Sequence, residues 1–417
     1  MHSPSTLYLS PFTFRLYLLP FIRILHHHFA MLKLPIYLDN NATTPVDPEV
    51  LQSMLPFFTT HFGNAASRNH AFGWAAEEAV KQAREQVAAL INAEPEEIIF
   101  TSGATEAINL AIKGTTELYT GESKHIITCA TEHKAVLDTC KHLEKSGVAV
   151  THLAVDANGL INIDELKAAI RKDTVLIAVM YANNETGVIQ PINEIGLIAK
   201  EHGILFFSDA TQAVGKIPVN VQKDQIDMLC LSAHKIYGPK GAGALYVRRK
   251  NPRVKLVAQI DGGGHERGMR SGTLNVPGIA GLGKACALCS VHMRTEAVNI
   301  VALRDKLEQA LLQIQGCVVN GDTQHRLPNV TNITFGNIKT DRLLANISNT
   351  IAVSSGSACT SANPEPSHVL KAMGVEDVLA KNSIRFGLGR FTTEEEIDYT
   401  VTEVTRIVKL HQSYVRE

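Results

Sequence analysis

Short apolar segments alternate with amphipathic segments along most of the chain, from about Thr44 onward. In Trp74–Asn92, Ala, Val and Leu recur at helical spacing with charged residues on the opposite face, which predicts an amphipathic helix. The apolar runs between such helices are continuous, which is typical of strands buried on both faces of a sheet. The predicted strands are Glu97–Thr101, His125–Cys129, Val148–Leu153, Thr174–Tyr181, Ile204–Ser208, Met228–Ser232 and Gly243–Arg248, and the further helices are Ala135–Lys145, Asp164–Ile170 and Ile192–His202. This alternation predicts an α/β fold with a mostly parallel sheet flanked by helices.

A different order of elements begins at about Leu282. A long helical pattern over Ala297–Gln315 precedes short strands near Val330–Phe335 and Ser383–Gly387, and a charged helical pattern over Thr393–His411 follows them. This order is typical of an α+β arrangement and predicts a smaller second domain.

The length of 417 residues also favours two domains, because one hydrophobic core seldom serves so long a chain. We predict a large domain over residues 45–290 that carries the cofactor site proposed below. The small domain is expected to combine residues 31–44 with residues 291–417.

Residues 1–30 differ from the rest and are not expected to be part of the fold. Met1–Leu38 contains no Asp or Glu, and the apolar run Phe12–Leu25 is too short to span a bilayer and lacks the charge order of a secretory signal. Two interpretations remain open: an organellar transit peptide, or a true start of translation at Met31, which we favour.

The charge and cysteine content narrow the function classes. Forty basic residues against 41 acidic ones leave a formal net charge of −1, so we expect neither a nucleic-acid partner nor a membrane partner. Seven scattered cysteines do not suggest a disulfide framework and favour a reducing compartment. We therefore expect a cytoplasmic protein, with a mitochondrial location as the alternative if residues 1–30 are a transit peptide.

Three segments place reactive groups at the ends of predicted strands, where open α/β sheets usually bind ligands. Lys235 follows the strand Met228–Ser232, and a desolvated lysine there has a lowered pKa and can attack an aldehyde. Asp209 closes another strand and could pair with the protonated ring nitrogen of pyridoxal phosphate (PLP), although a helix N-cap is the alternative. The segment TSGATE at 101–106 is typical of a phosphate cradle at a helix N-terminus or of a capping box.

Cys359 lies among small polar residues, SSGSACTSANPEPS, which is the composition of an exposed loop. Its thiolate is therefore a candidate nucleophile. Cys129 and Cys140 are expected to be core residues. Cys286 and Cys289 have metal-ligand spacing but lie in an apolar helical stretch without a second ligand pair, so we do not expect them to bind metal.

Taken together, these motifs resemble those of cysteine desulfurases of the NifS/IscS type, which belong to the class-V aminotransferase family and have the PLP-dependent fold type I. The resemblance extends in order from about Ile36 to the C-terminus. The motifs are YLDNNATT at 37–44, TSGATE at 101–106, TEHKAVLDTC at 131–140, NNETG at 183–187, SDATQ at 208–212, SAHKIYGPKG at 232–241, GGGHERGMRSGT at 262–273, SSGSACTS at 354–361 and SIRFGLGRFTTEEEID at 383–398.

The resemblance implies a role for each matching residue. Lys235 would bind PLP as a Schiff base, Cys359 would receive the sulfur, and His133 would stack on the ring and move protons. The implied cofactor-binding residues are Ala104, Thr105, His133, Asn184, Asp209, Gln212, Ser232, His234, Lys235 and Thr273, the last donated across a homodimer. Arg385 would bind the substrate carboxylate, and Asn41 is a weaker candidate for the same pocket.

The implied reaction converts L-cysteine to L-alanine and leaves a persulfide on Cys359. The sulfur would pass to an acceptor such as an iron–sulfur scaffold protein for cluster assembly, and its use for tRNA thiolation remains open. No resident metal is implied, but Cys359 could share a transient iron–sulfur cluster with the scaffold. Because the chain ends soon after its last helix, the C-terminal extension that docks the scaffold is expected to be missing.

Alternatives remain within the same fold and outside it. A selenocysteine lyase or an aminotransferase would share the PLP residues, but a transaminase has no need of Cys359. A non-catalytic sulfur-relay partner would be expected to lack Lys235 or Asp209, and both are present.

Overall fold

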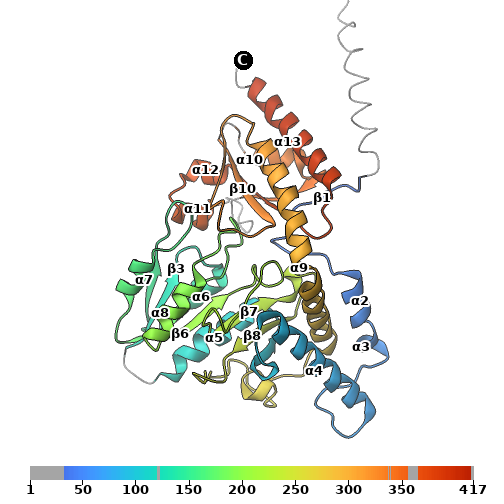
Figure 1. Ribbon diagram of the computed structural model, residues 1–417, viewed down its shortest axis with the longest axis vertical. Helices are drawn as coiled ribbons and strands as arrows, with labels where there is room; N and C mark the ends of the chain where they lie inside the picture. The colour runs from blue at the N-terminus through green and yellow to red at the C-terminus, as the bar shows by residue number, and fades with distance from the viewer. Residues whose placement is uncertain (1–31, 120–122, 337, 339, 356–364, 415–417) are drawn as a thin grey trace, which may run out of the picture.

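The computed structural model describes residues 32–119, 123–336, 338, 340–355 and 365–414, and Figure 1 shows a lower body built on a large sheet and an upper, smaller body. The large sheet has seven strands in the order β2-β8-β7-β6-β5-β3-β4. The strands are β2 (Ile98–Thr101), β3 (His125–Cys129), β4 (Ala149–Leu153), β5 (Thr174–Ala178), β6 (Leu205–Asp209), β7 (Met228–Ser232) and β8 (Gly243–Val247). Only β8 runs antiparallel to its neighbours, β2 and β7. The predicted α/β class with a mostly parallel sheet is therefore confirmed.

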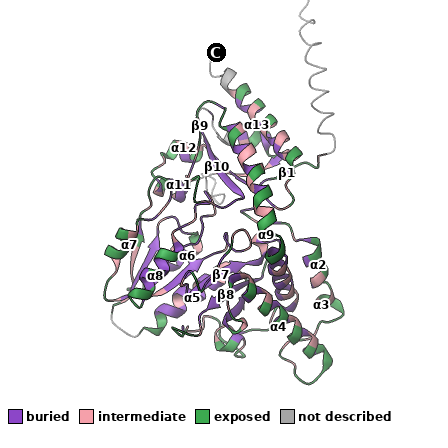
Figure 2. Cartoon of the chain, viewed as in Figure 1, coloured by how far each residue is buried: buried purple, intermediate pink, exposed green. Residues whose placement is uncertain are grey.

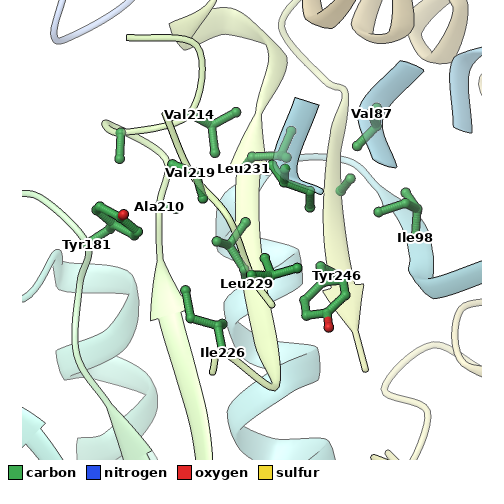
Figure 3. Packing of buried hydrophobic residues seen from close by; sticks show 14 of the residues in the cluster. Val87, Ile98, Tyr181, Ala210, Val214, Val219, Ile226, Leu229, Leu231 and Tyr246 are labelled. Atoms are coloured by element: carbon green, nitrogen blue, oxygen red, sulfur yellow. The ribbon is translucent and has the colours of Figure 1, made fainter. Parts of the chain in front are cut away.

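Helices cover both faces of this sheet, and alternate strand residues supply the two cores. Along β7, Leu229 and Leu231 belong to one buried cluster, and Met228 and Cys230 belong to the other. The first cluster includes residues of α4 (Ala71–Ile91) and α8 (Ile192–Glu201), and the second includes residues of α5 (Ala104–Leu118) and α6 (Lys134–Glu144). Figure 3 shows the first cluster around Leu229 and Tyr246, and in Figure 2 the strands of this sheet, apart from the edge strand β4, are almost wholly buried. The helix α7 (Ile163–Ala169) lies beyond β4 in the chain.

The upper body is built on a four-stranded antiparallel sheet in the order β12-β13-β10-β9. These strands are β9 (Cys317–Val319), β10 (Val330–Phe335), β12 (Ser354–Ser355) and β13 (Ser383–Gly387). The N-terminal strand β1 (Ile36–Tyr37) pairs in parallel with β11 (Ile351–Ala352), and Ile36 together with Leu38, which follows the strand, belongs to the core of this body. The accompanying helices are α10 (Thr340–Ile347), α11 (His368–Ala372), α12 (Asp377–Lys381) and α13 (Glu394–Tyr414), and α2 (Pro48–Met54) and α3 (Pro56–Thr59) follow β1 in the chain.

One long helix, α9 (Val276–Leu311), corrects the prediction of a helix over Ala297–Gln315. Its first half, up to about Cys289, is apolar except at Lys284 and packs against α4 and α2, so it shows little amphipathic period. Glycines there permit close packing: a Cβ added at Gly283 would lie 2.5 Å from the Cα of Ala83. The predicted domain boundary at residues 290 and 291 falls inside this helix.

The same helix is long and apolar enough to cross a membrane by length and composition, although 56% of its most apolar window is buried in the protein. Cys286 and Cys289 are buried in this apolar half. Cys129 and Cys140 are also buried, as predicted for core residues, and burial raises the pKa of each thiol to about 12.

Candidate active site

A cavity of about 650 Å³ opens at the carboxyl ends of the parallel strands. All but two of the predicted site residues line it: Asn41, Ala104, Thr105, His133, Asn184, Asp209, Gln212, Ser232, His234, Lys235 and Arg385. Thr273 is exposed and is not among the described residues that line the cavity. Cys359 lies outside the described residues. Polar groups that are far apart in the sequence therefore meet in one cavity, which has ample room for a small aromatic ligand.

Lys235 is placed by β7 and the short 3-10 turn Ala233–Lys235 that follows it. Its Nζ donates hydrogen bonds to the backbone oxygens of Asn41 and Ala42, each at 2.6 Å. Burial, followed by the positive charge of Arg385, lowers the pKa of Lys235 to about 8. A larger fraction of this amine than of an ordinary lysine is therefore neutral near physiological pH and able to attack an aldehyde.

Asp209 is the last residue of β6 and is buried. Its Oδ1 accepts hydrogen bonds from the backbone N–H of Thr211 at 3.0 Å and from the Cys230 thiol at 3.3 Å. These bonds hold the carboxylate at the cavity. A buried carboxylate there favours a cationic ligand group, such as a protonated ring nitrogen.

The segment 101–106 forms a concave turn at the start of α5. Gly103 is the N-cap, with φ of 151°, a conformation that favours glycine, and it has no side chain to occupy the first-turn N–H groups. Gly243 also has to lack a side chain, because a Cβ there would lie 2.6 Å from the Cα of Gly103. Together with Ser232 and His234, this turn offers hydrogen-bond donors suited to a phosphate group.

His234 and His133 present their imidazoles differently. Burial, followed by the charge of Lys235, lowers the pKa of His234 to about 4, so its imidazole is neutral at pH 7. The Nδ1 of His133, the N-cap of α6, accepts the backbone N–H of Ala135 at 3.1 Å. When neutral, His133 therefore carries its proton on Nε2.

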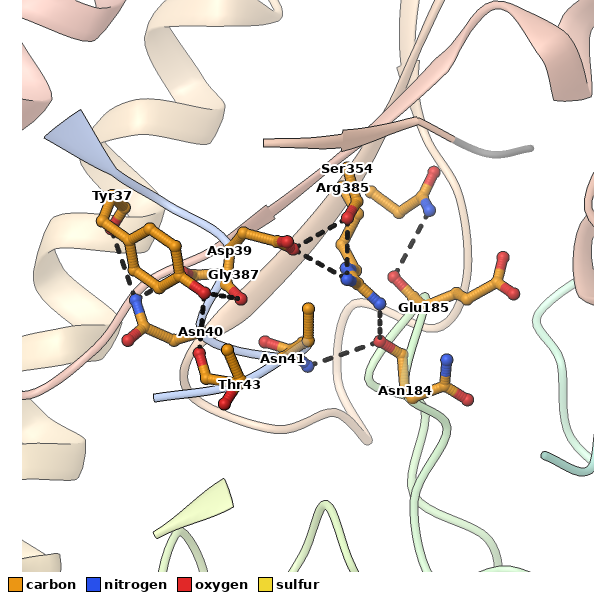
Figure 4. Close-up of polar contacts among 12 residues, drawn as sticks. Tyr37, Asp39, Asn40, Asn41, Thr43, Asn184, Glu185, Ser354, Arg385 and Gly387 are labelled. Carbon is orange, nitrogen blue, oxygen red and sulfur yellow. Dashed lines mark hydrogen bonds and ion pairs between the residues drawn. The ribbon is translucent and has the colours of Figure 1, made fainter. Parts of the chain in front are cut away.

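Arg385, on β13, links the two bodies at the cavity, as Figure 4 shows. Its Nη1 donates to the backbone oxygen of Asn184 at 2.9 Å, and its Nη2 donates to Asp39 Oδ1 at 2.8 Å and Ser354 Oγ at 3.0 Å. Its Nε is buried and has no hydrogen-bond partner among the described residues. The guanidinium thus still has an unused donor, as a carboxylate site requires.

The amide side chains of Asn329, Asn41 and Gln212 are joined one to the next by hydrogen bonds beside Lys235. The Nδ2 of Asn329 donates to Asn41 Oδ1 at 3.0 Å, and Asn41 Nδ2 donates to Gln212 Oε1 at 3.3 Å. Gln212 Nε2 returns a hydrogen bond to the backbone oxygen of Asn41 at 3.0 Å. Asn41 is therefore a link between the N-terminal segment and the cavity.

Sequence reasoning missed several contacts around the cavity. Lys216 donates to Gln212 Oε1 at 2.7 Å, and its place four residues after Gln212 was the available signal. Glu106 pairs with Arg270 at 2.8 Å and accepts the backbone N–H of Ser102, which ties the turn at 101–106 to the segment that carries Thr273. No local sequence pattern predicts the contact between Asp39 and Arg385, because the two residues are far apart in the chain.

Comparison with a family model and with individual relatives identifies the same protein family. A model of the aminotransferase class-V family matches residues 36–400. The cysteine desulfurase IscS of Anaeromyxobacter dehalogenans (strain 2CP-C) is 57% identical over 371 residues, which are 89% of this chain and 91% of that protein. The cysteine desulfurase IscS of Escherichia coli O139:H28 (strain E24377A / ETEC) is 54% identical over 379 residues, 90% of this chain and 93% of the relative.

Solved structures agree with these relatives. A NifS-like protein superposes with a TM-score of 0.85 at 38% identity, covering 90% of this chain and all of its own. The structure described as SspA in complex with cysteine superposes with a TM-score of 0.76 at 39% identity, covering 86% of this chain and all of its own.

Proposed function

Because this chain belongs to the class-V aminotransferase family, among the PLP-dependent cysteine desulfurases, we propose that it takes sulfur from L-cysteine and releases L-alanine. The observation that carries the proposal is the meeting of Lys235, Asp209 and Arg385 at one cavity. These residues supply an amine for an aldehyde, a carboxylate for a cationic ring and a guanidinium for a substrate carboxylate.

The cavity fits PLP by its donor set. Lys235 would hold the cofactor covalently, Asp209 would pair with its ring nitrogen, and Gln212 would donate to its ring oxygen. The turn at 101–106, including Ala104 and Thr105, would bind the phosphate together with Ser232 and His234, while His133 would stack on the ring and Asn184 would contact it nearby. When bound, the cofactor supplies an electron sink for bonds that break at the substrate.

Arg385 would bind the carboxylate of L-cysteine, with Asn41 beside it. Its Nε, which has no hydrogen-bond partner in the described part of the chain, supports this role, and a substrate carboxylate would compete with Asp39 for the Nη2 group. We expect Arg385→Lys to raise KM by about 10- to 100-fold with a smaller change in kcat, because a lysine lacks the fork that binds a carboxylate at two points. Steady-state kinetics of alanine formation would measure this, with Arg253→Lys on the exposed surface as the matched control. An unchanged KM would contradict the assignment.

Cys359 would take the sulfur. Its thiolate forms a bond with the substrate sulfur as the carbon–sulfur bond breaks, and the electron pair of the broken bond passes to the substrate carbon, which is then protonated. Described residues anchor both sides of the Cys359 segment: Ser354 accepts a hydrogen bond from Arg385, and Ser367 donates to Glu185 Oε2 at 2.5 Å.

After the transfer to Cys359, an acceptor such as an iron–sulfur scaffold protein would remove the sulfur, for cluster assembly and possible use in tRNA thiolation. Docking of this acceptor would use the small body and the Cys359 segment.

The working form would be a homodimer in the cytoplasm. Thr273 is exposed, outside the cavity of its own chain, yet the ion pair between Arg270 and Glu106 holds its segment beside the phosphate-binding turn. Such a place suits donation of Thr273 to the site of a second copy. A native mass equal to one chain would contradict the dimer.

The six described cysteines are all free, which supports a reducing compartment.

The function is tested by the products formed from L-cysteine in the presence of a thiol reductant. Alanine and sulfide are expected in equal amounts, because each turnover breaks one carbon–sulfur bond. A keto acid in place of alanine would indicate an aminotransferase, and turnover of L-selenocysteine alone would indicate a selenocysteine lyase. Either outcome would overturn the proposal.

A further inference from the structure

A second lysine, Lys216, lies directly behind the candidate active site. It lines a separate small cavity of about 20 Å³, which it shares with Lys235 and Glu296 and which has room for about one water molecule. Lys216 is not among the described residues that line the cofactor cavity. It therefore lies close to the site residues while lying outside the cavity that would hold the cofactor and the substrate.

Lys216 contacts the site through Gln212. Its Nζ donates to Gln212 Oε1 at 2.7 Å, and Asn41 Nδ2 donates to the same oxygen at 3.3 Å. A side-chain amide has one acceptor oxygen and two N–H donors. With its oxygen occupied by Lys216 and Asn41, Gln212 has to turn its nitrogen the other way, and one N–H goes to the backbone oxygen of Asn41. The second N–H is then left for the cavity that Gln212 lines.

The opposite orientation of the amide would place its oxygen against the backbone oxygen of Asn41 and its NH₂ group against Lys216 and Asn41 Nδ2. The ammonium form of Lys216, which the hydrogen bond to Gln212 Oε1 favours, can donate hydrogen bonds but cannot accept them, so it would repel the NH₂ group of a flipped Gln212. Asn41 supports the same orientation through its backbone oxygen at 3.0 Å and its Nδ2 at 3.3 Å, and Lys216 makes the shortest of the three contacts, at 2.7 Å.

We propose that Lys216 is a positioning residue that fixes the amide of Gln212 so that an N–H, and not the oxygen, faces the ring oxygen of PLP. This inference rests on the proposed function. An N–H donated to the ring oxygen favours the anionic form of that oxygen, whereas an amide oxygen in its place would disfavour it.

The surroundings of Lys216 agree with this role. Burial, followed by the charges of Lys235 and Arg385, lowers the pKa of Lys216 to about 7. The charged and titratable groups around it are Lys235, Arg385, Cys289, Glu296 and Tyr237. Retaining a lysine at such an electrostatic cost is consistent with a specific use of its donor.

The test uses the visible absorbance of the cofactor-loaded protein, followed as a function of pH. In Lys216→Met, the midpoint of the pH-dependent absorbance change is expected to rise by about one to two pH units, the size expected for one lost hydrogen bond to a charged group. Lys216→Ala removes the same donor without placing a long apolar side chain there and is expected to give the same shift. Lys200→Met is the matched control, because Lys200 also donates to a glutamine, Gln225 Oε1 at 2.9 Å, but lies outside the site.

A double variant separates positioning from a direct effect of charge. In a Gln212→Ala background, Lys216→Met is expected to cause no further shift, because the group that it positions is absent. An equal shift in both backgrounds would overturn the inference, and so would an unchanged midpoint in Lys216→Met and Lys216→Ala. Wild-type protein that forms alanine while these variants show no shift would overturn this inference alone, whereas wild-type protein that forms no alanine would overturn the proposed function.

Discussion

Lys235→Ala is expected to lose alanine formation by about 10²- to 10⁴-fold, the range typical of a side chain that transfers protons at the reacting atoms. The same change removes the amine that would hold PLP covalently, so borohydride reduction is expected to leave no cofactor attached to the chain. In the wild type, the pKa of Lys235 is lowered to about 8, so its neutral amine is available both to transfer protons and to form the covalent bond to PLP. The measurements are the initial rate of alanine formation with added PLP and the mass of the reduced protein.

The control for Lys235→Ala is Lys250→Ala, which removes an exposed lysine outside the cavity. The control is expected to keep the wild-type rate and the wild-type reduced mass. Full activity in Lys235→Ala would contradict its assignment. Reduced protein labelled at Lys216 instead of Lys235 would contradict it as well, and would show that the second lysine reaches the cofactor.

Cys359→Ala is expected to abolish the protein-bound persulfide and to reduce sulfide release to background, while the absorbance of bound PLP stays unchanged. The reason is that Cys359 would attack the substrate sulfur and would have no part in holding the cofactor. The described cysteines are poor substitutes for it, since burial raises the pKa of each of their thiols. Sulfide release and the mass of the protein after brief exposure to L-cysteine would measure the effect.

Cys317→Ala is the matched control for this experiment, because Cys317 is the described cysteine that is not fully buried. Burial still raises the pKa of its thiol to about 11, so its thiolate is scarce at neutral pH and its loss should leave the rate unchanged. A Cys359→Ala variant as active as wild type would show that another thiol, or free cysteine, takes the sulfur.

The candidate site could be predicted from the sequence where its residues lie next to recognisable strand ends. Asp209 and Lys235 close or follow β6 and β7, and parallel strands bring their carboxyl ends to one edge, so local patterns were sufficient to place them together. The contacts of Arg385 with Asp39 and Ser354 join segments from different parts of the chain, and periodicity carries no information about such pairs.

The helix α9 shows the same limit in the fold. An amphipathic period reveals a helix only where one face meets water, as in α4. The first half of α9 is packed on several sides and carries Gly278, Gly281 and Gly283, which ordinarily argue against a helix. These glycines instead provide room for close neighbours, because a Cβ added at Gly283 would lie only 2.5 Å from the Cα of Ala83.

Because α9 is one continuous helix, its length fixes the spacing between the large body, which carries Lys235, and the small body, which carries Arg385. Its residues up to Cys289 belong to the core that supports Lys235, and those from Ile300 onward belong to the core that supports Arg385. Residues 290–299 between them include no buried residue. One residue inserted there would turn the second half by about 100° and displace it by about 1.5 Å, which would separate Arg385 from Asn184. Glu296 pairs with Arg390, and Met293 and Ala297 line the small cavity beside Lys216. At the other positions, this stretch should therefore tolerate substitutions far better than insertions or deletions.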